Sequence, residues 1–259
     1  MKLTILGCGT SSGVPRIGRE WGACDPDEPR NRRTRPAIVV ETATTRILVD
    51  TGPDMREQLL AADIGVVDAV IWTHDHADHC HGIDDLRQLF HARGSPVPGF
   101  ARAETLAALQ RRFGYVFQGK QGYPATVDGG VLSDDQQVGD IRVRVVDQPH
   151  GSTTSAGLRF DHDGTAIGYA TDVHAMTDAM ATLYRDLDLW IVDALRRAPH
   201  ASHAHLDRTL GWIADLRPAE AILTHMDQSM DYHPLCAALP VGIVPGHDGL
   251  IRRFGHDGR

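Results

Sequence analysis

The sequence predicts a layered α/β protein with mixed sheets. Short runs rich in valine and isoleucine recur along the 259 residues, and segments with apolar residues at helical spacing lie between several of them. Some predicted strands follow one another directly and others alternate with helices, a pattern typical of mixed sheets covered by helices. Because no repeat, low-complexity tract or linker interrupts the pattern, we expect a single domain over residues 1–259.

The predicted strands are short and are bounded by glycine, proline, aspartate or threonine, which interrupt regular structure. They cover residues 2–6, 37–41, 46–49, 69–72, 141–146, 166–169, 189–192 and 219–223. The spacing of apolar residues predicts helices over residues 54–62, 82–91, 103–113, 176–184 and 206–216. Residues 93–98 and 119–124 contain the glycine and proline that are typical of loops.

The composition is that of an ordinary globular protein, with 42% apolar and 23% charged residues. The formal net charge is −8, whereas binding along a nucleic acid needs many lysine and arginine contacts to phosphate. We therefore do not expect an extended nucleic-acid interface. A small anionic substrate fits better, since bound metal ions can supply positive charge locally.

The four cysteines, Cys8, Cys24, Cys80 and Cys236, form no C-x-x-C pair. We interpret them as free thiols in a reducing compartment, because a chain of this size needs no disulfide framework. The N-terminal apolar run is too short for a secretory signal, and no apolar run approaches the ~18 residues that span a bilayer. The sequence predicts a soluble, cytoplasmic protein with no membrane segment, and it leaves open whether the chain forms a homodimer.

Good metal ligands follow four of the predicted strands. They are His74, His76, Asp78 and His79 after residues 69–72, His150 after 141–146, Asp172 after 166–169, and His225 after 219–223. Strand ends that share one sheet edge converge in space, which is where α/β proteins usually build sites. Imidazole and carboxylate ligands suit zinc and manganese, so the pattern predicts two divalent metal ions, Zn or Mn.

The segment from His74 to His79 reads H-x-H-x-D-H. His74 and His76 are two residues apart, so in an extended segment their rings point the same way and can share one cation. Asp78 and His79 can face a second cation if the chain turns there. The alternative is an exposed polar loop, but the apolar strand before the run and the matching ligands downstream favour a metal site.

With these ligands the sequence resembles the metallo-β-lactamase superfamily. The resemblance implies a four-layer αβ/βα sandwich of two mixed sheets, with the metals at one edge. It implies that His74, His76 and His150 bind the first metal. It also implies that Asp78, His79 and His225 bind the second, and that Asp172 bridges the two.

A closer resemblance covers nearly the whole chain. Residues 6–15, 31–35, 48–53, 82–87, 223–226 and 248–250 are similar to the phosphoribosyl cyclic phosphodiesterases of the PhnP-like branch and to their tRNase Z relatives. The match implies that His203, between His200 and His205, is a catalytic acid. Asp78 is expected to orient or deprotonate the attacking water as well as to bind metal. Where many PhnP-like proteins carry several zinc-binding cysteines only Cys24 remains, and the long basic arm with which tRNase Z grips tRNA is not visible.

Four further features each allow two interpretations. Asp50 is either a turn former or, as the resemblance implies, a carboxylate that orients a ligand histidine. Arg32 and Arg33 belong, with Arg30 and Arg35, to a basic cluster that is either a solvated face or a phosphate-binding group. Asp193, at the end of residues 189–192, is a strand cap or a supporting residue of the site. Residues 113–124 are either a lid or plain packing.

Together these patterns predict a binuclear metal-dependent phosphodiesterase. Its substrate is expected to be a small cyclic or linear phosphodiester, such as a cyclic ribose phosphate or nucleotide, attacked by a hydroxide that bridges the metals. His203 is expected to protonate the leaving alkoxide. The alternatives are an RNA-processing nuclease of the tRNase Z type, a thioester or lactone hydrolase on the same fold, and a non-catalytic metal-dependent binding protein.

Overall fold

The structure is a computed structural model that describes residues 1–255. One sheet contains seven strands, namely β1 (Lys2–Gly7), β2 (Ala37–Glu41), β3 (Arg46–Val49), β4 (Ala69–Trp72), β5 (Val97–Ala101), β6 (Val127–Val131) and β14 (Ile251–Arg253). The other also contains seven, namely β7 (Asp135–Val138), β8 (Ile141–His150), β9 (Thr153–His162), β10 (Thr165–Ala170), β11 (Leu189–Asp193), β12 (Glu220–Thr224) and β13 (Ile243–Pro245). The strand orders are β14-β1-β2-β3-β4-β5-β6 and β13-β12-β11-β10-β9-β8-β7.

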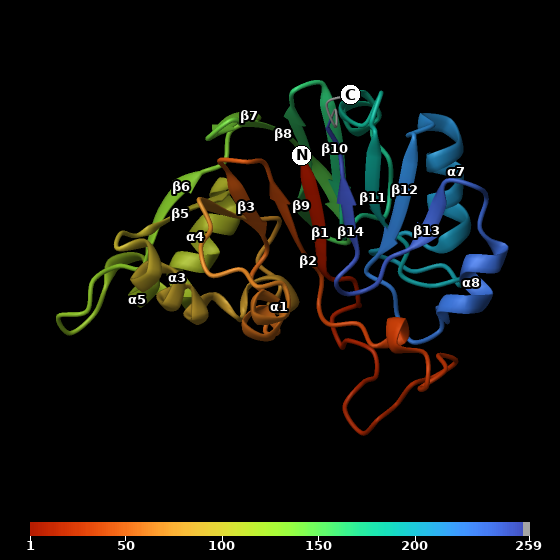
Figure 1. Cartoon of the computed structure of the whole chain (residues 1–259), viewed down its shortest axis with the longest axis horizontal. Coiled ribbons are helices and arrows are strands. Elements are labelled where there is room, and N and C mark those ends of the chain that lie inside the picture. Colours follow the sequence, from red (N-terminus) through yellow and green to blue (C-terminus); the bar gives the residue numbers. More distant parts are fainter. Residues whose placement is uncertain (256–259) are drawn as a thin grey trace.

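Helices cover the outer faces of both sheets (Figure 1). Those next to the first sheet are α1 (Met55–Ala61), α2 (Ala77–Cys80), α3 (Leu86–Arg93), α4 (Ala103–Arg112) and α5 (Gly114–Gln118), with a 3-10 turn over Ile83–Asp85. Those next to the second are α6 (Asp178–Leu183), α7 (Leu206–Leu216) and α8 (Tyr232–Ala238); a further 3-10 turn covers Pro29–Asn31. The layers are helix, sheet, sheet and helix, so the predicted αβ/βα sandwich is confirmed.

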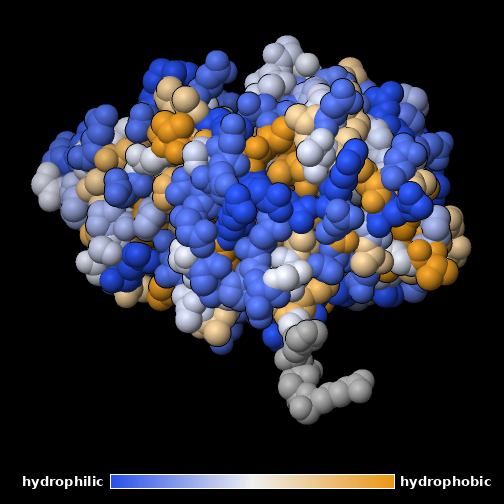
Figure 2. Space-filling view, turned by 90° about the horizontal axis from the view of Figure 1, so that it is seen from above, coloured by the Kyte–Doolittle hydropathy of each residue, from blue (hydrophilic) through white to orange (hydrophobic). Residues whose placement is uncertain are grey.

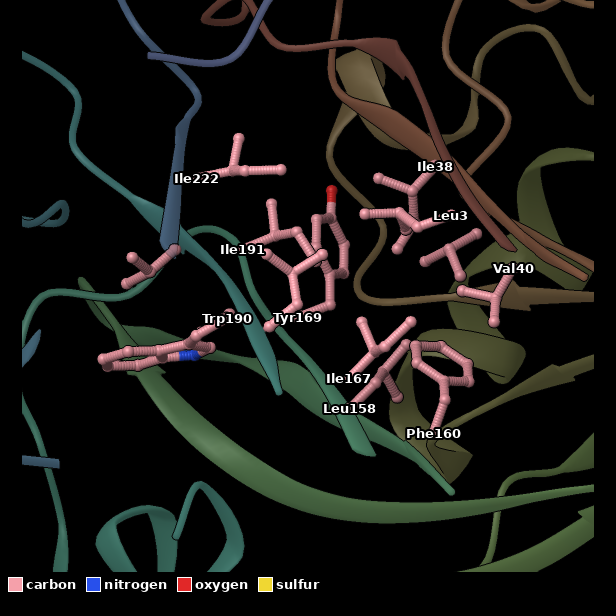
Figure 3. Close-up of a cluster of buried hydrophobic side chains, with 14 of the residues drawn as sticks. Leu3, Ile38, Val40, Leu158, Phe160, Ile167, Tyr169, Trp190, Ile191 and Ile222 are labelled. Atoms are coloured by element: carbon pink, nitrogen blue, oxygen red, sulfur yellow. The ribbon is translucent and has the colours of Figure 1, made fainter. Parts of the chain in front are cut away.

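The main core lies between the two sheets (Figure 3). β2 shows how one strand serves two layers. Ile38 and Val40 pack toward the second sheet, whereas Ala37 and Val39 pack toward the helices, because successive side chains of a strand point to opposite faces. Both faces are covered, so the strand is apolar throughout its buried part. Across the interface, Leu158, Phe160 and Ile167 belong to the same buried cluster as Ile38 and Val40.

The parallel strands place their carboxyl ends on one edge of the sandwich. β3 pairs in parallel with β4, and β10, β11 and β12 are mutually parallel. A parallel bridge between Gly9 and Met226 joins the chain just beyond β1 to the chain just beyond β12, so this edge is shared by both sheets. All the predicted metal ligands lie along it.

The eight predicted strands agree with observed ones, with one exception in length. The strand predicted over residues 141–146 runs on as β8 to His150, because β9 pairs with it over its whole length. Residues 93–98, predicted as a loop, include the first residues of β5, and the predicted helix over 82–91 is divided into a 3-10 turn and α3. β5, β6, β7, β9, β13 and β14 escaped prediction; the first three contain glycine, proline or glutamine and become strands through pairing with neighbours.

The face of the molecule seen in Figure 2 is mainly hydrophilic, with scattered apolar patches. None of the helices within residues 1–255 combines the length and hydrophobicity that a bilayer crossing requires.

Candidate metal centre and active site

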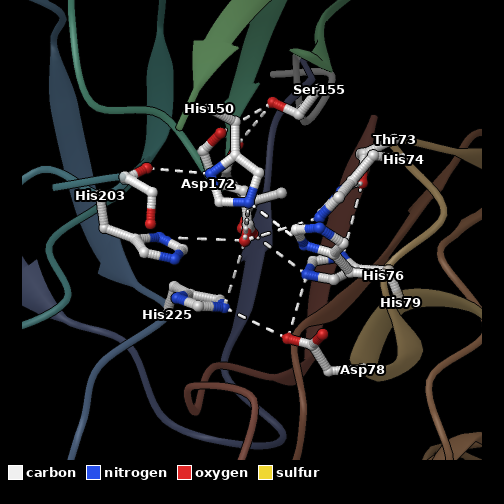
Figure 4. A network of polar contacts seen from close by, with 12 residues as sticks. Thr73, His74, His76, Asp78, His79, His150, Ser155, Asp172, His203 and His225 are labelled. Carbon is white, nitrogen blue, oxygen red and sulfur yellow. Dashed lines mark hydrogen bonds and ion pairs between the residues drawn. The ribbon is translucent and has the colours of Figure 1, made fainter. Parts of the chain in front are cut away.

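The seven predicted ligands meet at the shared edge of the two sheets (Figure 4). β4 leads to His74, and α2, which follows at once, carries Asp78 and His79 on its single turn. His150 is the last residue of β8, while Asp172 and His225 lie just beyond β10 and β12. The turn expected after His76 is therefore the start of α2.

Two of these strand ends share an unusual backbone conformation. Asp172 and His225 have φ angles of 54° and 59°, and Asp50, just beyond β3, has a φ of 66°. The left-handed region is costly for residues other than glycine, although aspartate and histidine tolerate it better than most. Such strain concentrates at functional sites, where the surrounding structure holds it in place.

The first ligand group contains His74, His76 and His150 together with Asp172, and their ligand atoms lie within 4.8 Å of one another. His150 Nε2 is 3.2 Å from His76 Nδ1 and 3.6 Å from Asp172 Oδ1. His74 Nε2 is 3.7 Å from the same Asp172 oxygen. His76 is exposed at the mouth of the site, whereas the other three are buried.

The second ligand group contains Asp78, His79 and His225. Asp78 Oδ2 lies 3.4 Å from His79 Nε2 and 3.5 Å from His225 Nε2. Asp172 faces this group as well, since its Oδ2 is 3.1 Å from His79 Nε2 and its Oδ1 is 3.6 Å from His225 Nε2. One carboxylate thus lies within reach of both groups, the position that a bridging ligand requires.

The donor set fits divalent metal ions. The Nε2 atoms of His74 and His79 are buried and form no hydrogen bond within residues 1–255. Their Nδ1 atoms are held from behind, His74 by the Thr73 hydroxyl at 3.1 Å and His79 by Asp50 Oδ2 at 2.7 Å. A ligand histidine is usually fixed in this way, with one nitrogen held and the other left for the metal. His150 follows the same rule through its Nδ1 and the Ser202 carbonyl at 2.9 Å.

The metal-free cluster binds protons where a metal would bind. Burial lowers the pKa of His79, but Asp172, Asp78 and Asp50 outweigh this effect and raise its pKa well above the usual value. Burial likewise opposes the charge on His225, yet Asp172 and Asp78 raise its pKa to about 9. Metal ions must displace these protons, so metal binding is expected to release them.

The pKa values of His74 and Asp172 are shifted in the opposite direction, downward. Burial lowers the pKa of His74 well below its usual value, and the nearby His79 lowers it further. Burial raises the pKa of Asp172, but the imidazoles of His225 and His79 more than compensate and leave it well below the usual value. His74 is therefore neutral and Asp172 ionised, which are the forms that bind metals.

Asp50 lies behind the second ligand group. It is fully buried at the end of β3, where Oδ1 accepts a hydrogen bond from the Thr73 main-chain N–H at 2.8 Å and Oδ2 contacts His79 Nδ1. These are the contacts expected of a residue that orients a ligand. Thr171, directly before Asp172, donates from its hydroxyl to Asp172 Oδ2 at 2.6 Å and holds the shared carboxylate in the same manner.

His203 lies beside the ligands but is held from elsewhere. Its Nδ1 is 2.9 Å from Asp193 Oδ2, and its ring stacks on that of His225 with centroids 4.7 Å apart. Asp193 is fully buried at the end of β11 and also accepts the Val173 main-chain N–H. The role of Asp193, open from the sequence, is thus contact with His203; the sequence signal is its place at a strand end, as for the ligands.

The basic cluster divides into separate roles. Arg33 is 1% exposed, and its guanidinium donates to the main-chain oxygens of Met230 and Asp227. It therefore holds the packing of this loop and is not available to contact a phosphate. Arg32 is exposed and its guanidinium lies 5.7 Å from the centre of the Trp21 ring. Arg30 pairs with Glu28, and Arg35 with Asp54.

The other histidines of the His203 segment lie at its borders. His200 Nδ1 accepts a hydrogen bond from the Ser202 main-chain N–H, and its ring centre is 5.2 Å from that of His203. His205 precedes α7. The region predicted as lid or packing contains α5, and its Phe113 packs edge-on against His81 at 5.7 Å.

Comparison with known proteins yields one family and several relatives. Residues 45–226 match the model of the beta-lactamase superfamily domain. The chain is 32% identical over 257 residues to an octanoyltransferase of Porphyromonas gingivalis, covering 96% of this chain and 51% of that protein. It is 30% identical over 131 residues to a ribonuclease Z of Methanopyrus kandleri, covering 49% of this chain and 44% of that one. The chain thus spans about half the length of these curated relatives.

Among solved structures, the chain is similar to a diphosphatase of the PhnP family. The two superpose with a TM-score of 0.89 at 35% sequence identity, covering 98% of this chain and 96% of the other. The similarity therefore extends over the whole sandwich and both ligand groups.

Proposed function

Since the chain belongs to the beta-lactamase superfamily and, within it, to the PhnP family, we propose that it is a metal-dependent phosphodiesterase for small cyclic or linear phosphodiesters. It is a hydrolase of the metallo-β-lactamase fold with histidine and aspartate groups suited to divalent metals. One observation carries the proposal: Asp172 faces two ligand groups, and His203, held by Asp193, lies against the second of them. Diphosphatase and ribonuclease, the names of two similar proteins, both denote hydrolysis at phosphate.

In this proposal the site holds two ions, zinc or manganese. His74, His76 and His150 would hold one, Asp78, His79 and His225 would hold the other, and Asp172 would be within reach of both. Bound divalent ions supply Lewis acidity, which stabilises negative charge on phosphate oxygens and makes hydroxide available near neutral pH. Asp78 Oδ2 lies between His79 and His225, where it would also orient the attacking water.

His203 supplies the proton that the leaving group needs. Asp193 occupies its Nδ1, so Nε2 is the atom that donates to the leaving oxygen. Asp193 keeps the ring in this orientation, as a carboxylate does for a catalytic histidine. Protonation matters for a sugar alkoxide, which is a poor leaving group.

The experiment is a substrate screen of protein whose metal content has been measured. We expect about two equivalents of zinc or manganese per chain, and turnover of bis(4-nitrophenyl) phosphate and of a cyclic ribose phosphate that a chelator abolishes. Full metal content without turnover of any phosphodiester would overturn the proposal. Preference for a thioester or lactone would assign the site to a different hydrolase, and efficient processing of precursor tRNA would assign it to RNA maturation.

A further inference from the structure

We propose that the turn formed by residues 10–13, together with Arg35 and Arg16, binds a second phosphate group of the substrate beside the metal centre. The inference rests on the proposed function, which places the first phosphate at the metals. It goes further by naming the substrate class as a compound with two linked phosphates.

The turn lies next to the second ligand group. The Thr10 main-chain N–H donates to the Met226 carbonyl at 3.1 Å, and Met226 directly follows the ligand His225. Gly9 forms a bridge with the same residue. In Figure 4 the dark red chain of the N-terminal segment passes below His225 and Asp78. A phosphate on this turn would be a neighbour of one held at the metals.

The turn presents donors that have no partner. It is closed by the Gly13 N–H donating to the Thr10 carbonyl at 2.7 Å, and Gly13 has a φ of 66° that favours glycine. The main-chain N–H groups of Ser11 and Ser12 form no hydrogen bond within the described residues, and both side chains are exposed. Successive free N–H groups in a turn form a concavity that attracts anions.

Arg35 brings a fixed guanidinium to this turn. Asp54 holds it from behind, through the Arg35 main-chain N–H at 2.8 Å and through Nε at 3.1 Å. Its two terminal nitrogens form no hydrogen bond in the part of the chain that the structure describes, and the side chain is 27% exposed. A Cβ added at Gly13 would lie 3.5 Å from Arg35 Nη1, so the guanidinium reaches the turn.

The base of the Arg35 side chain lies near Gly52, against the main chain of Asp78. A Cβ added at Gly52 would lie 3.4 Å from Arg35 Cβ and would clash with the main-chain oxygen of Asp78, a metal ligand in the proposal. Arg35 therefore lies between the turn and the second ligand group. Of the basic cluster, it is this arginine, rather than Arg32 or Arg33, that the fold presents beside the metal centre.

Arg16, whose Nη1 also lies 3.8 Å from Glu20 Oε1, adds a second cation at the turn. Its Nε donates to the Ser12 hydroxyl at 3.3 Å, and its side chain is 40% exposed. The turn therefore has one guanidinium near Gly13 and another at Ser12, and it offers the free main-chain N–H groups of Ser11 and Ser12. Guanidinium forks match phosphate oxygens well, and charge-assisted hydrogen bonds of this kind are among the stronger ones.

The test compares two non-hydrolysable anions on zinc-loaded protein. Methylenediphosphonate carries two phosphonates and methylphosphonate carries one, and their dissociation constants are measured by calorimetry. Arg35→Gln is expected to weaken the binding of methylenediphosphonate about tenfold or more. The binding of methylphosphonate is expected to weaken less than about twofold. Ser11→Asp, an exposed substitution that leaves the Asp54 pair intact, is expected to act in the same direction by repulsion, so that the test holds even if Arg35→Gln folds poorly.

Arg253→Gln is the matched control. Arg253 is exposed and lies opposite Lys2 in the pairing of β14 with β1, at the other end of β1 from the turn. Both affinities are therefore expected to stay unchanged. If Arg35→Gln weakens the binding of both anions equally, or of neither, the proposal is overturned and Arg35 remains a structural partner of Asp54. Bis(4-nitrophenyl) phosphate turnover is measured in parallel. If the wild type lacks it while the selective loss is seen, the proposed function fails and the second phosphate site stands.

Discussion

His203 differs from His79 and His150 in its exposure and in its place in the chain. The rings of His79 and His150 are held from behind by Asp50 and a main-chain carbonyl, and their free nitrogens face other ligands. His203 lies on the loop between β11 and α7, takes its partner Asp193 from β11, and has 12% of its side chain exposed. A partly exposed imidazole held by a buried carboxylate is suited to proton transfer.

His203→Ala tests this role through the leaving group. The loss of rate on an alkyl or ribose diester is expected to be about 10²–10⁴-fold, since general acid catalysis contributes that much. A nitrophenolate leaves without a proton, so the loss on bis(4-nitrophenyl) phosphate should be clearly smaller, with metal content unchanged. Equal losses on both substrates would indicate that His203 binds phosphate, and loss of metal would make it a ligand.

Asp193→Asn tests the pair. If Asp193 acts only through His203, the variant slows the alkyl diester, and combining it with His203→Ala adds almost nothing further, because residues that act as a unit are not additive. The four kcat values of this double-mutant cycle are the measurement. Fully additive losses would show that Asp193 acts on its own, for example by supporting the Val173 main chain that it also contacts.

Among the secondary elements, the short helix α2 is held by close backbone packing. It carries both Asp78 and His79, and it rests on the segment after β3, where the Thr51 N–H donates to the His79 carbonyl at 2.7 Å. Gly52 in that segment has no room for a side chain, because a Cβ would clash with the Asp78 carbonyl. The second ligand group is thus positioned by main-chain contact.

Gly52→Ala is therefore expected to damage the second ligand group selectively. Overpacking of this kind costs about 1–3 kcal/mol of unfolding free energy, and relief of the clash must displace α2. In a metal titration, we expect the affinity for one equivalent to fall while the other changes little, since His74 and His150 lie outside α2. Gly65→Ala is the control, because a Cβ there meets nothing within 4 Å. Unchanged binding of both equivalents would argue against this packing role.

At the scale of the whole molecule, the negative charge of the buried carboxylates in the metal centre must be balanced by metal ions or by protons. Asp50, Asp78 and Asp172 are buried together, and in the metal-free protein the protons on His79 and His225 offset their charge. Because both histidines have raised pKa values, the folded state binds these protons more tightly than the unfolded state does. The stability of the metal-free protein must then depend on pH.

The direction in which the free energy of unfolding changes with pH follows from His225. Its folded pKa of about 9 exceeds its ordinary value of 6.5, so its stabilising effect is complete below pH 6.5 and is lost as the pH rises to 9. We expect the free energy of unfolding of metal-free protein to fall across this range, by up to about 3 kcal/mol for one such group. The lowered pKa of His74 acts only below pH 6.5. Thermal unfolding of metal-free and zinc-loaded protein measures this; a flat metal-free profile would contradict it.

The surface charge predicts how activity responds to salt. With a net charge of −8, the molecule offers few cations for long phosphate chains. A substrate held by one or two phosphates is expected to lose less than about tenfold in kcat/KM between 50 and 200 mM salt, whereas a protein that contacts six or more phosphates loses about a thousandfold. Steep salt dependence with precursor tRNA, together with efficient processing of it, would point to an extended RNA interface.

Local pattern was sufficient to predict eight of the strands and to identify the candidate ligands that follow them, which the structure brings together. His74 to His79 and the ends of β10 and β12 combine a buried apolar run with a polar residue directly after it, and such signals need no distant partner. The four-layer architecture and the sharing of ligands between two metals came from resemblance to a family, which the matched model and the two seven-stranded sheets bear out for the fold.

Features that depend on residues far apart in the chain could not be predicted. β6 and β7 are weak strand sequences that become strands by pairing, and β8 extends to His150 because β9 lies beside it. Arg33 and Arg35 are two residues apart, yet one is buried against the carbonyl of Met230 while the other is held by Asp54 at the edge of the site. Burial and partners depend on how strands pack in three dimensions, and neighbours in sequence can differ completely in both.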